Sequence, residues 1–301
     1  MMKTFFGIDD LPSGHASNRL IHGCMVLEGG AFRALYSEGV LDALMQADIN
    51  LDCTIGVSGG AMNGLSYTMG QIGRSALLNL KYRHDPEYVG LHTQNTGIIG
   101  FDFVFKGRFA QEHPWDLDTF YQKERRFVAV CTDLETGKAT YFEKSRCDDI
   151  FKAVEASASM PYVSKPIKMQ GGLYLDGGCS VKIPVQWAID QGYEKIVVVR
   201  TRPRSYRKKE HTMHRINRLF YKDYPAFQQQ LDTSNRRYNE ECDRIDQLTD
   251  THRIFTFYPS EPITISRLES NMDKLGQLYY LGYEDAKGQL AQLKTYLEAT
   301  K

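Results

Sequence analysis

One stretch, Gly56-Val57-Ser58-Gly59-Gly60, restricts the possible folds of this 301-residue chain more than any other. It ends an apolar run over Leu51–Val57, which predicts a strand, and a helical pattern over Ala61–Met69 follows it. A serine at such a junction lies on a sharp turn, where neighbouring glycines leave space that a Cβ would fill. The pentapeptide alone fits a plain strand-to-helix loop as well as a nucleophilic serine. Other parts of the chain must decide between the two.

A second glycine-containing loop lies upstream. Cys24–Leu27 predicts a short buried strand, which runs into Glu28-Gly29-Gly30-Ala31-Phe32-Arg33. Apolar residues at helical spacing follow, namely Leu35, Val40, Leu41 and Leu44. A loop between strand and helix aims backbone N–H groups at the helix N-terminus, where negative charge is favoured. The loop is therefore either an anion site or a tight connection without a ligand, and its glycine spacing does not fit a dinucleotide fingerprint.

A third glycine-rich stretch, Gly171–Gly178, predicts a short strand that delivers Asp176 into a turn made by Gly177 and Gly178. The alternation of strands and helices along the chain predicts an α/β fold, a three-layer α/β/α domain with a mostly parallel central sheet and a helical C-terminal part. We expect residues 1–203 to form the catalytic domain and residues 204–301 a helical region with one further strand, packed on the same domain. The other expected strands are Arg126–Thr132, Ala139–Phe142, Lys195–Arg200 and Ile254–Tyr258, and the other expected helices are Arg74–His84, one capped by Asp148, Pro184–Asp190, Pro225–Thr249 and Met272–Leu297.

Composition narrows the class of protein. Thirty-seven basic residues balance 37 acidic ones, so no global field attracts nucleic acid. Scattered cysteines without metal-ligand spacing suggest a reducing compartment, with no metal and no cofactor. We find no signal peptide or membrane-spanning run and expect a cytoplasmic protein. A basic stretch from Arg200 to Arg218 is most often a solvated surface, and the alternative is peripheral contact with anionic head groups.

Taken together, the three glycine stretches resemble the patatin-like phospholipase family, and the bacterial subgroup most closely. That family carries a G-G-G-x-R-G loop, a G-x-S-x-G elbow and a D-G-[GA] motif, in this order. Here they read Gly29-Gly30-Ala31-Phe32-Arg33-Ala34, Gly56–Gly60 and Asp176-Gly177-Gly178. Alanine replaces glycine at positions 31 and 34, which keeps the backbone donors but would strain the loop wherever a positive φ is needed.

The resemblance implies a Ser-Asp dyad that hydrolyses carboxyl esters of lipids. Ser58 would be the nucleophile, Asp176 the base, and the N–H groups of Gly29, Gly30 and Ala31 the oxyanion donors. Arg33 would shape the loop or form an ion pair, for example with Glu28. The supporting glycines are Gly56, Gly60, Gly177 and Gly178.

Two alternatives stay open. The first is an α/β-hydrolase triad, for which His252, His211 and His214 come late enough in the chain, although His252 precedes a predicted strand where that fold would place its histidine after one. The second is a binding module that keeps the fold and holds an anionic ligand or a membrane surface without catalysis. The apolar segment His92–Pro114, with Phe101–Phe105 inside it, could line an acyl pocket or simply pack in the core.

Overall fold

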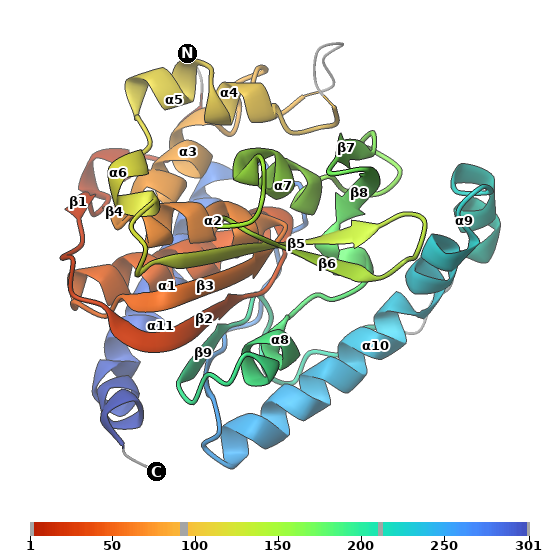
Figure 1. The fold of residues 1–301 in the computed structure, drawn as a ribbon. Helices are drawn as coiled ribbons and strands as arrows, with labels where there is room; N and C mark the ends of the chain where they lie inside the picture. Colours follow the sequence, from red (N-terminus) through yellow and green to blue (C-terminus); the bar gives the residue numbers. More distant parts are fainter. Residues whose placement is uncertain (1–2, 91–95, 210–212, 300–301) are drawn as a thin grey trace.

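The computed structural model describes residues 3–90, 96–209 and 213–299, and its elements surround one central sheet (Figure 1). The strand order is β10-β9-β2-β3-β5-β8-β7, and β6 pairs with β5 off this path. The first five of these strands run parallel, whereas β6 and β8 are antiparallel to β5, and β7 to β8. The strands are β2 (Ile21–Leu27), β3 (Leu51–Val57), β5 (Arg126–Asp133), β6 (Ala139–Glu143), β7 (Ile167–Met169), β8 (Gly172–Asp176), β9 (Ile196–Val199) and β10 (Phe255–Phe257). The mostly parallel sheet predicted from the sequence is confirmed.

Helices cover both faces of the sheet. In β2, Met25 and Leu27 pack into a core with α1, α3 and α11, while Cys24 and Val26 point the other way, toward α8 and α10. This alternation follows from the two-residue period of a strand and produces the three predicted layers. The helices are α1 (Leu35–Gln46), α2 (Gly59–Thr68), α3 (Arg74–Tyr82), α4 (Phe101–Phe105), α5 (Arg108–Glu112), α6 (Leu117–Phe120), α7 (Ile150–Ser157), α8 (Val185–Asp190), α9 (His214–Phe220), α10 (Pro225–Asp250) and α11 (Met272–Glu298).

The register around β5 determines where two strands end. Val57, the last residue of β3, lies opposite Val130 of β5, and Asp176, the last residue of β8, lies opposite Cys131. β6 pairs with residues 128–132 of β5, which overlap both the residues paired with β3 and those paired with β8. β6 therefore lies along one edge of β5, and β3 and β8 both lie along the opposite edge. The two strands run in opposite directions, so their carboxyl ends meet there. The residues that follow β3 and those that end β8 are therefore neighbours.

The C-terminal region is built into the same layers. β10 pairs in parallel with β9, and α11 crosses α1 so closely that a Cβ on Gly39 or Gly282 would lie 2.0 Å from a backbone oxygen of the other helix. Buried Leu275, Leu278 and Tyr279 of α11 belong to the core around α1. The boundary after residue 203 stays a prediction.

Two details differ from the sequence-based expectations. The helix α7 begins one residue later than predicted, so its cap is Asp149, which accepts the Lys152 N–H at 3.0 Å, and Asp148 does not cap it. The apolar segment His92–Pro114, for which no helix was expected, contains two short helices, α4 and α5, while its residues 92–95 lie outside the described ranges. Within those ranges no helix combines the length and the apolarity needed to cross a membrane.

Candidate active site

Ser58 lies on a sharp turn between β3 and α2, with φ 56° and ψ −125°. Such a backbone conformation is rare for a residue with a side chain and persists only where the surroundings impose it. The surroundings here are tight, because a Cβ on Gly56 would lie 2.5 Å from the Gly60 carbonyl oxygen, and one on Gly60 would lie 2.6 Å from that of Leu27. The glycines of the pentapeptide therefore allow the turn, as the sequence predicts.

A serine that the sequence motifs do not reveal helps to hold this turn. Ser157, at the end of α7, accepts the Ser58 N–H at 2.9 Å and donates to the Val130 carbonyl at 2.6 Å. It is fully buried, so both bonds are shielded from water. Ser157 thus ties the turn to β5 through a helix almost a hundred residues further along the chain.

Asp176 lies next to Ser58 at the end of β8. The Ser58 hydroxyl donates to Asp176 Oδ2 at 2.8 Å, and the Gly178 N–H donates to Asp176 Oδ1 at 2.7 Å. A Cβ on Gly177 would lie 2.1 Å from a carbonyl oxygen of β5, which explains the glycine after the aspartate. The Thr132 hydroxyl fixes the same turn by donating to the Asp176 carbonyl at 2.9 Å. The structure therefore brings together the two residues that the sequence singled out.

The electrostatic surroundings of Asp176 make its carboxylate more basic than an exposed one. Burial raises its pKa, while the Gly178 N–H, the Ser58 hydroxyl and the nearby cations Arg267 and Lys182 lower it by a smaller amount. The net direction is upward from the usual value. This raised pKa improves an otherwise weak base for a hydroxyl proton.

The glycine loop lies against the serine. A Cβ on Gly29 would be 3.1 Å from that of Ser58. The Gly29 N–H, an oxyanion donor according to the resemblance, donates to the Lys182 carbonyl at 3.5 Å and is therefore already engaged. Ala31 has a positive φ of 49°, whereas Ala34 is helical, with φ −67°. The strain expected from alanine in this loop thus falls on Ala31 alone. Within the described ranges the N–H groups of Gly30 and Ala31 have no backbone acceptor, so both are available to a ligand.

The N-terminus of α2 offers a further N–H group that the motif comparison overlooked. Gly59 directly follows Ser58 and begins this ten-residue helix, so its N–H has no acceptor within the helix. A Cβ on Gly59 would meet the Ala31 carbonyl at 3.1 Å, which places the helix end beside the loop. The residue after a nucleophile commonly supplies such a donor.

One interpretation of the sequence expected an ion pair between Arg33 and Glu28, but these two side chains do not pair. The Glu28 carboxylate accepts from Arg200 Nε at 3.0 Å, the Thr201 N–H at 2.6 Å and the Tyr238 hydroxyl at 2.8 Å. Arg33 is buried, and its Nε has no hydrogen-bond partner within the described residues. Burial lowers the pKa of Arg33 to about 10, with further lowering by neighbouring arginines. Glu28 therefore acts on Arg33 through its charge, which raises the Arg33 pKa by a smaller amount, but the two side chains form no ion pair.

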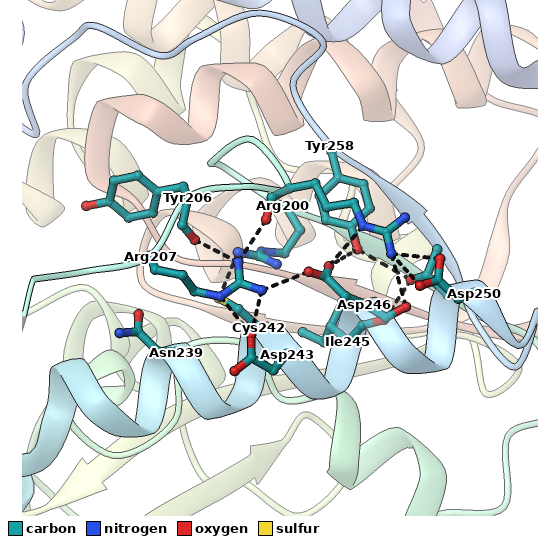
Figure 2. Close-up of polar contacts among 12 residues, drawn as sticks. Arg200, Tyr206, Arg207, Asn239, Cys242, Asp243, Ile245, Asp246, Asp250 and Tyr258 are labelled. Atoms are coloured by element: carbon teal, nitrogen blue, oxygen red, sulfur yellow. Dashed lines mark hydrogen bonds and ion pairs between the residues drawn. The ribbon is translucent and has the colours of Figure 1, made fainter.

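The predicted basic surface from Arg200 to Arg218 is partly neutralised, because three of its arginines contact α10 or Glu28 (Figure 2). Arg200 is fully buried, and its Nη2 donates to the Tyr238 hydroxyl and to Cys242 Sγ of α10. Arg204 and Arg207 form ion pairs with aspartates of α10, namely Asp243, Asp246 and Asp250. Arg202, Lys208 and Lys209 form no ion pair within the described residues, and Arg215 and Arg218 are exposed on α9.

Ser58 lies in the wall of two chambers. The first is mainly apolar and lies under the loop and α4, with a cavity volume of about 70 Å³. Its wall includes Phe32, Met62, Leu78, Tyr88, Phe101 and Val104. The second is polar and larger, about 520 Å³, and Asp176 and the glycine loop lie in its wall. An ester bound at Ser58 can therefore place its two halves in chemically different surroundings.

The histidines of the alternative triad are not at this site. His252 is exposed beyond the end of α10, and His214 pairs with Asp232 at the surface. His211 lies outside the described residues. Neither chamber has a histidine in its described wall.

Comparison with known proteins identifies the family of this chain. A family model described as patatin-like phospholipase matches residues 25–189, and one described as a domain of unknown function, DUF6363, matches residues 224–298. The uncharacterized protein YjjU of Escherichia coli K12 is 26% identical over 266 residues, which cover 86% of this chain and 74% of that protein. A probable lipid hydrolase, 463L of Invertebrate iridescent virus 6, is 23% identical over 237 residues, covering 70% and 82% respectively. Among solved structures, VipD from Legionella pneumophila matches with a TM-score of 0.48 and 11% identity, covering 94% of this chain and 68% of that one. Because the first family model spans more than half of the residues, the chain belongs to the patatin-like phospholipase family.

Proposed function

We propose that this protein is a serine acyl hydrolase that cleaves carboxyl esters of lipids through an acyl-Ser58 intermediate, with Asp176 as the base. One observation carries the proposal: a serine hydroxyl on a turn of positive φ donates a 2.8 Å hydrogen bond to a buried carboxylate. Membership in a phospholipase family supports hydrolysis of lipid esters. The name of one relative, a probable lipid hydrolase, agrees with that activity.

In the acylation step, Asp176 takes the Ser58 proton as Ser58 Oγ attacks the carbonyl carbon of the ester. The carbonyl π electrons move to the oxygen, which becomes an oxyanion within reach of the N–H groups of Gly30, Ala31 and Gly59. When the tetrahedral intermediate collapses, the ester C–O bond breaks and the leaving alcohol takes the proton from Asp176. Ser58 then carries the acyl group.

Deacylation repeats the same steps with water. Asp176 accepts a proton from the water molecule, the hydroxide attacks the acyl carbon, and Ser58 leaves with that proton. Because Asp176 is buried beside Ser58 and its pKa is raised, one carboxylate can serve both steps. Removal of one oxyanion donor typically costs about 2.7 to 4 kcal/mol of transition-state stabilisation, so the loop contributes as much as the dyad.

The apolar chamber supports an acyl chain as the acid part of the ester. Phe101 and Val104, from the run that the sequence left open between pocket and core, are part of its wall. With an acyl chain in this chamber, the carbonyl carbon would lie at Ser58 and the alcohol part would extend toward the polar chamber.

The dyad is tested by replacing each member and each competitor singly. We expect Ser58→Ala to abolish labelling by a fluorophosphonate and hydrolysis of short-chain p-nitrophenyl esters. We expect Asp176→Asn to slow hydrolysis at least about a thousandfold, while His252→Ala retains the wild-type rate. Asp148→Asn is the matched control, because that carboxylate is exposed and caps no helix.

The outcomes separate three mechanisms. A Ser-Asp dyad is refuted if Asp176→Asn keeps the wild-type rate. Loss of activity in His252→Ala alone would favour the triad. If the folded wild-type protein is not labelled at Ser58, a non-catalytic binding module is the better description.

We also propose that a cytoplasmic membrane surface is reached through α9, which lies in the predicted basic stretch. Leu219 and Phe220 are 76% and 55% exposed, and Arg215 and Arg218 are exposed on the same helix. Exposed apolar side chains beside cations fit an interface with anionic lipids. Asn217 of α9 lines the polar chamber, so such contact would bring the lipid to its entrance.

Cosedimentation with vesicles that contain anionic lipid tests this contact. Leu219→Ser should weaken binding about tenfold, because burying a leucine is worth about 1.5 to 3 kcal/mol. Leu117→Ser, at an exposed leucine of α6, is the control and should bind like the wild type. Equal binding by all three proteins would exclude α9 as the contact.

A further inference from the structure

The polar chamber carries more positive charge than the proposed acyl transfer uses. Five cationic side chains lie in its wall, namely Arg33, Lys182, Arg202, Lys208 and Arg267. They come from four separate segments of the chain, and none of them lines the apolar chamber. Such a concentration of like charge is unfavourable unless an anion enters it.

These cations are close enough to repel one another. Burial lowers the pKa of Arg33, and the charges of Arg202 and Arg267 lower it further. Lys208 has its pKa lowered to about 6, first by burial and then by Lys182 and Arg267. The repulsion is therefore shared across the chamber.

The carboxylates in the same wall are already engaged. Glu28 accepts from Arg200, Thr201 and Tyr238, and Asp176 accepts from Ser58 and the Gly178 N–H. Those two are the acidic residues among the described lining. A cation entering the chamber would thus meet like charge and no free carboxylate.

One buried donor lacks an acceptor. Arg33 is 8% exposed, and its Nε has no hydrogen-bond partner within the described residues. A buried unpaired donor on a charged group costs free energy, and native proteins rarely leave one without a ligand or water. Since Arg33 lines the chamber, an anion there could accept from it.

We propose that the chamber binds a phosphate group on the alcohol side of the ester, and so selects lipids with an anionic phosphate head group over zwitterionic or uncharged ones. This inference rests on the proposed function, which places the acyl chain in the apolar chamber and the alcohol in the polar one. Guanidinium and ammonium groups are the usual protein ligands of phosphate. A choline-type head group adds a cation for which the chamber wall has no free carboxylate.

Lys208 makes anion binding depend on pH. Its side chain lies 4.2 Å from the ring centroid of Tyr238, and the charged groups that act on it are Lys182, Arg267, Glu28 and Arg33. With a pKa of about 6, Lys208 is mostly neutral at pH 8 and mostly charged at pH 5. Sulfate is a suitable probe anion, because its own charge does not change over this range. We expect its affinity for the chamber to fall at least about fivefold from pH 5 to pH 8. Lys208→Met should flatten this dependence.

Head-group selection is measured with three lipids of identical acyl chains diluted in neutral detergent micelles: phosphatidic acid, phosphatidylcholine and diacylglycerol. We expect kcat/KM for phosphatidic acid to exceed that for phosphatidylcholine at least about tenfold. In Arg267→Gln this ratio should fall several-fold, and in Lys208→Met it should fall several-fold at pH 5, where Lys208 is mostly charged. Arg19→Gln, an exposed arginine paired with Asp48 at the far end of β2, should leave the ratio unchanged. The ratio is insensitive to a general loss of activity, which affects both lipids alike.

Equal kcat/KM values for the two phospholipids, or unchanged ratios in both chamber variants, would overturn the inference. Calorimetric titration of the Ser58→Ala protein with inorganic phosphate and with glycerol 3-phosphate separates a head-group site from a site for a free anion. Tighter binding of glycerol 3-phosphate supports the head-group site, whereas tighter binding of inorganic phosphate, or no binding of either, refutes it. If the wild type hydrolyses no ester at all, the proposed function fails, and the titration still decides what the chamber binds.

Discussion

The buried pair of Glu28 and Arg200 connects the glycine loop to α10, and its disruption gives the sharpest test of the fold around the site. Glu28 directly precedes Gly29, and Arg200 follows β9. We predict that Glu28→Gln destabilises the protein by about 3 to 5 kcal/mol, because it leaves a buried guanidinium charge without its counter-charge. Glutamine has nearly the same shape, so the loss would come from charge and not from a cavity.

The structure supports a value in this range. Arg200 is fully buried and Glu28 nearly so, and the glutamate accepts three hydrogen bonds, from Arg200, Thr201 and Tyr238. Water can therefore replace little of what the carboxylate provides. Since a protein of this kind is stable by about 5 to 15 kcal/mol in total, the single change would remove a large share of that stability.

Urea-induced unfolding followed by circular dichroism measures the effect. Arg204→Gln is the matched control, because it removes an arginine four residues away whose pair with Asp250 is exposed, and such pairs contribute about 0 to 1 kcal/mol. The double variant Glu28→Gln, Arg200→Met should regain stability relative to Glu28→Gln alone, since it removes the unpaired charge. The reasoning is refuted if Glu28→Gln lies within about 1 kcal/mol of the wild type, or if Arg204→Gln costs as much.

Three further predictions concern packing, pH and the nucleophile turn. Gly282→Ala should destabilise the protein by about 1 to 3 kcal/mol in thermal unfolding, because the new Cβ would lie 2.0 Å from a carbonyl oxygen of α1. Gly288 lies in the same helix with open space around it, so Gly288→Ala should stabilise the protein by about 0.5 to 1 kcal/mol. Burial raises the pKa of Asp42 to about 7, so its contribution to stability is complete below about pH 4 and is lost as pH rises through about 7. In urea unfolding, the wild type should therefore be less stable at pH 8 than at pH 5, and Asp42→Asn should show a smaller difference. An equal difference in both proteins would contradict this. Ser157→Ala leaves the Ser58 N–H without its acceptor and should lower kcat on a p-nitrophenyl ester about tenfold or more; an unchanged kcat would mean that the turn holds without it.

Much of the framework could be predicted from residues that are close in sequence. The strand at Leu51–Val57 has the predicted bounds, and the helix predicted over Met272–Leu297 forms as α11. These elements could be predicted because the spacing of apolar residues and the positions of glycines determine secondary structure within a few residues. Where a choice depended on one residue, such as Asp148 against Asp149 as a cap, the sequence rule did not decide it, since both are good caps.

The sequence by itself determined the three stretches that meet at Ser58, because the elbow, the glycine loop and the Asp-Gly turn each need their own residue types locally. Only the tertiary structure decided how they meet, through the register that ends β3 and β8 at neighbouring positions on one edge of β5. It also decided that Arg200 is buried and that Arg207 pairs with an aspartate of α10, which removes these two arginines from the predicted basic surface. The convergence of cations in the polar chamber was equally invisible, because its members lie far apart in the chain and only packing brings them together.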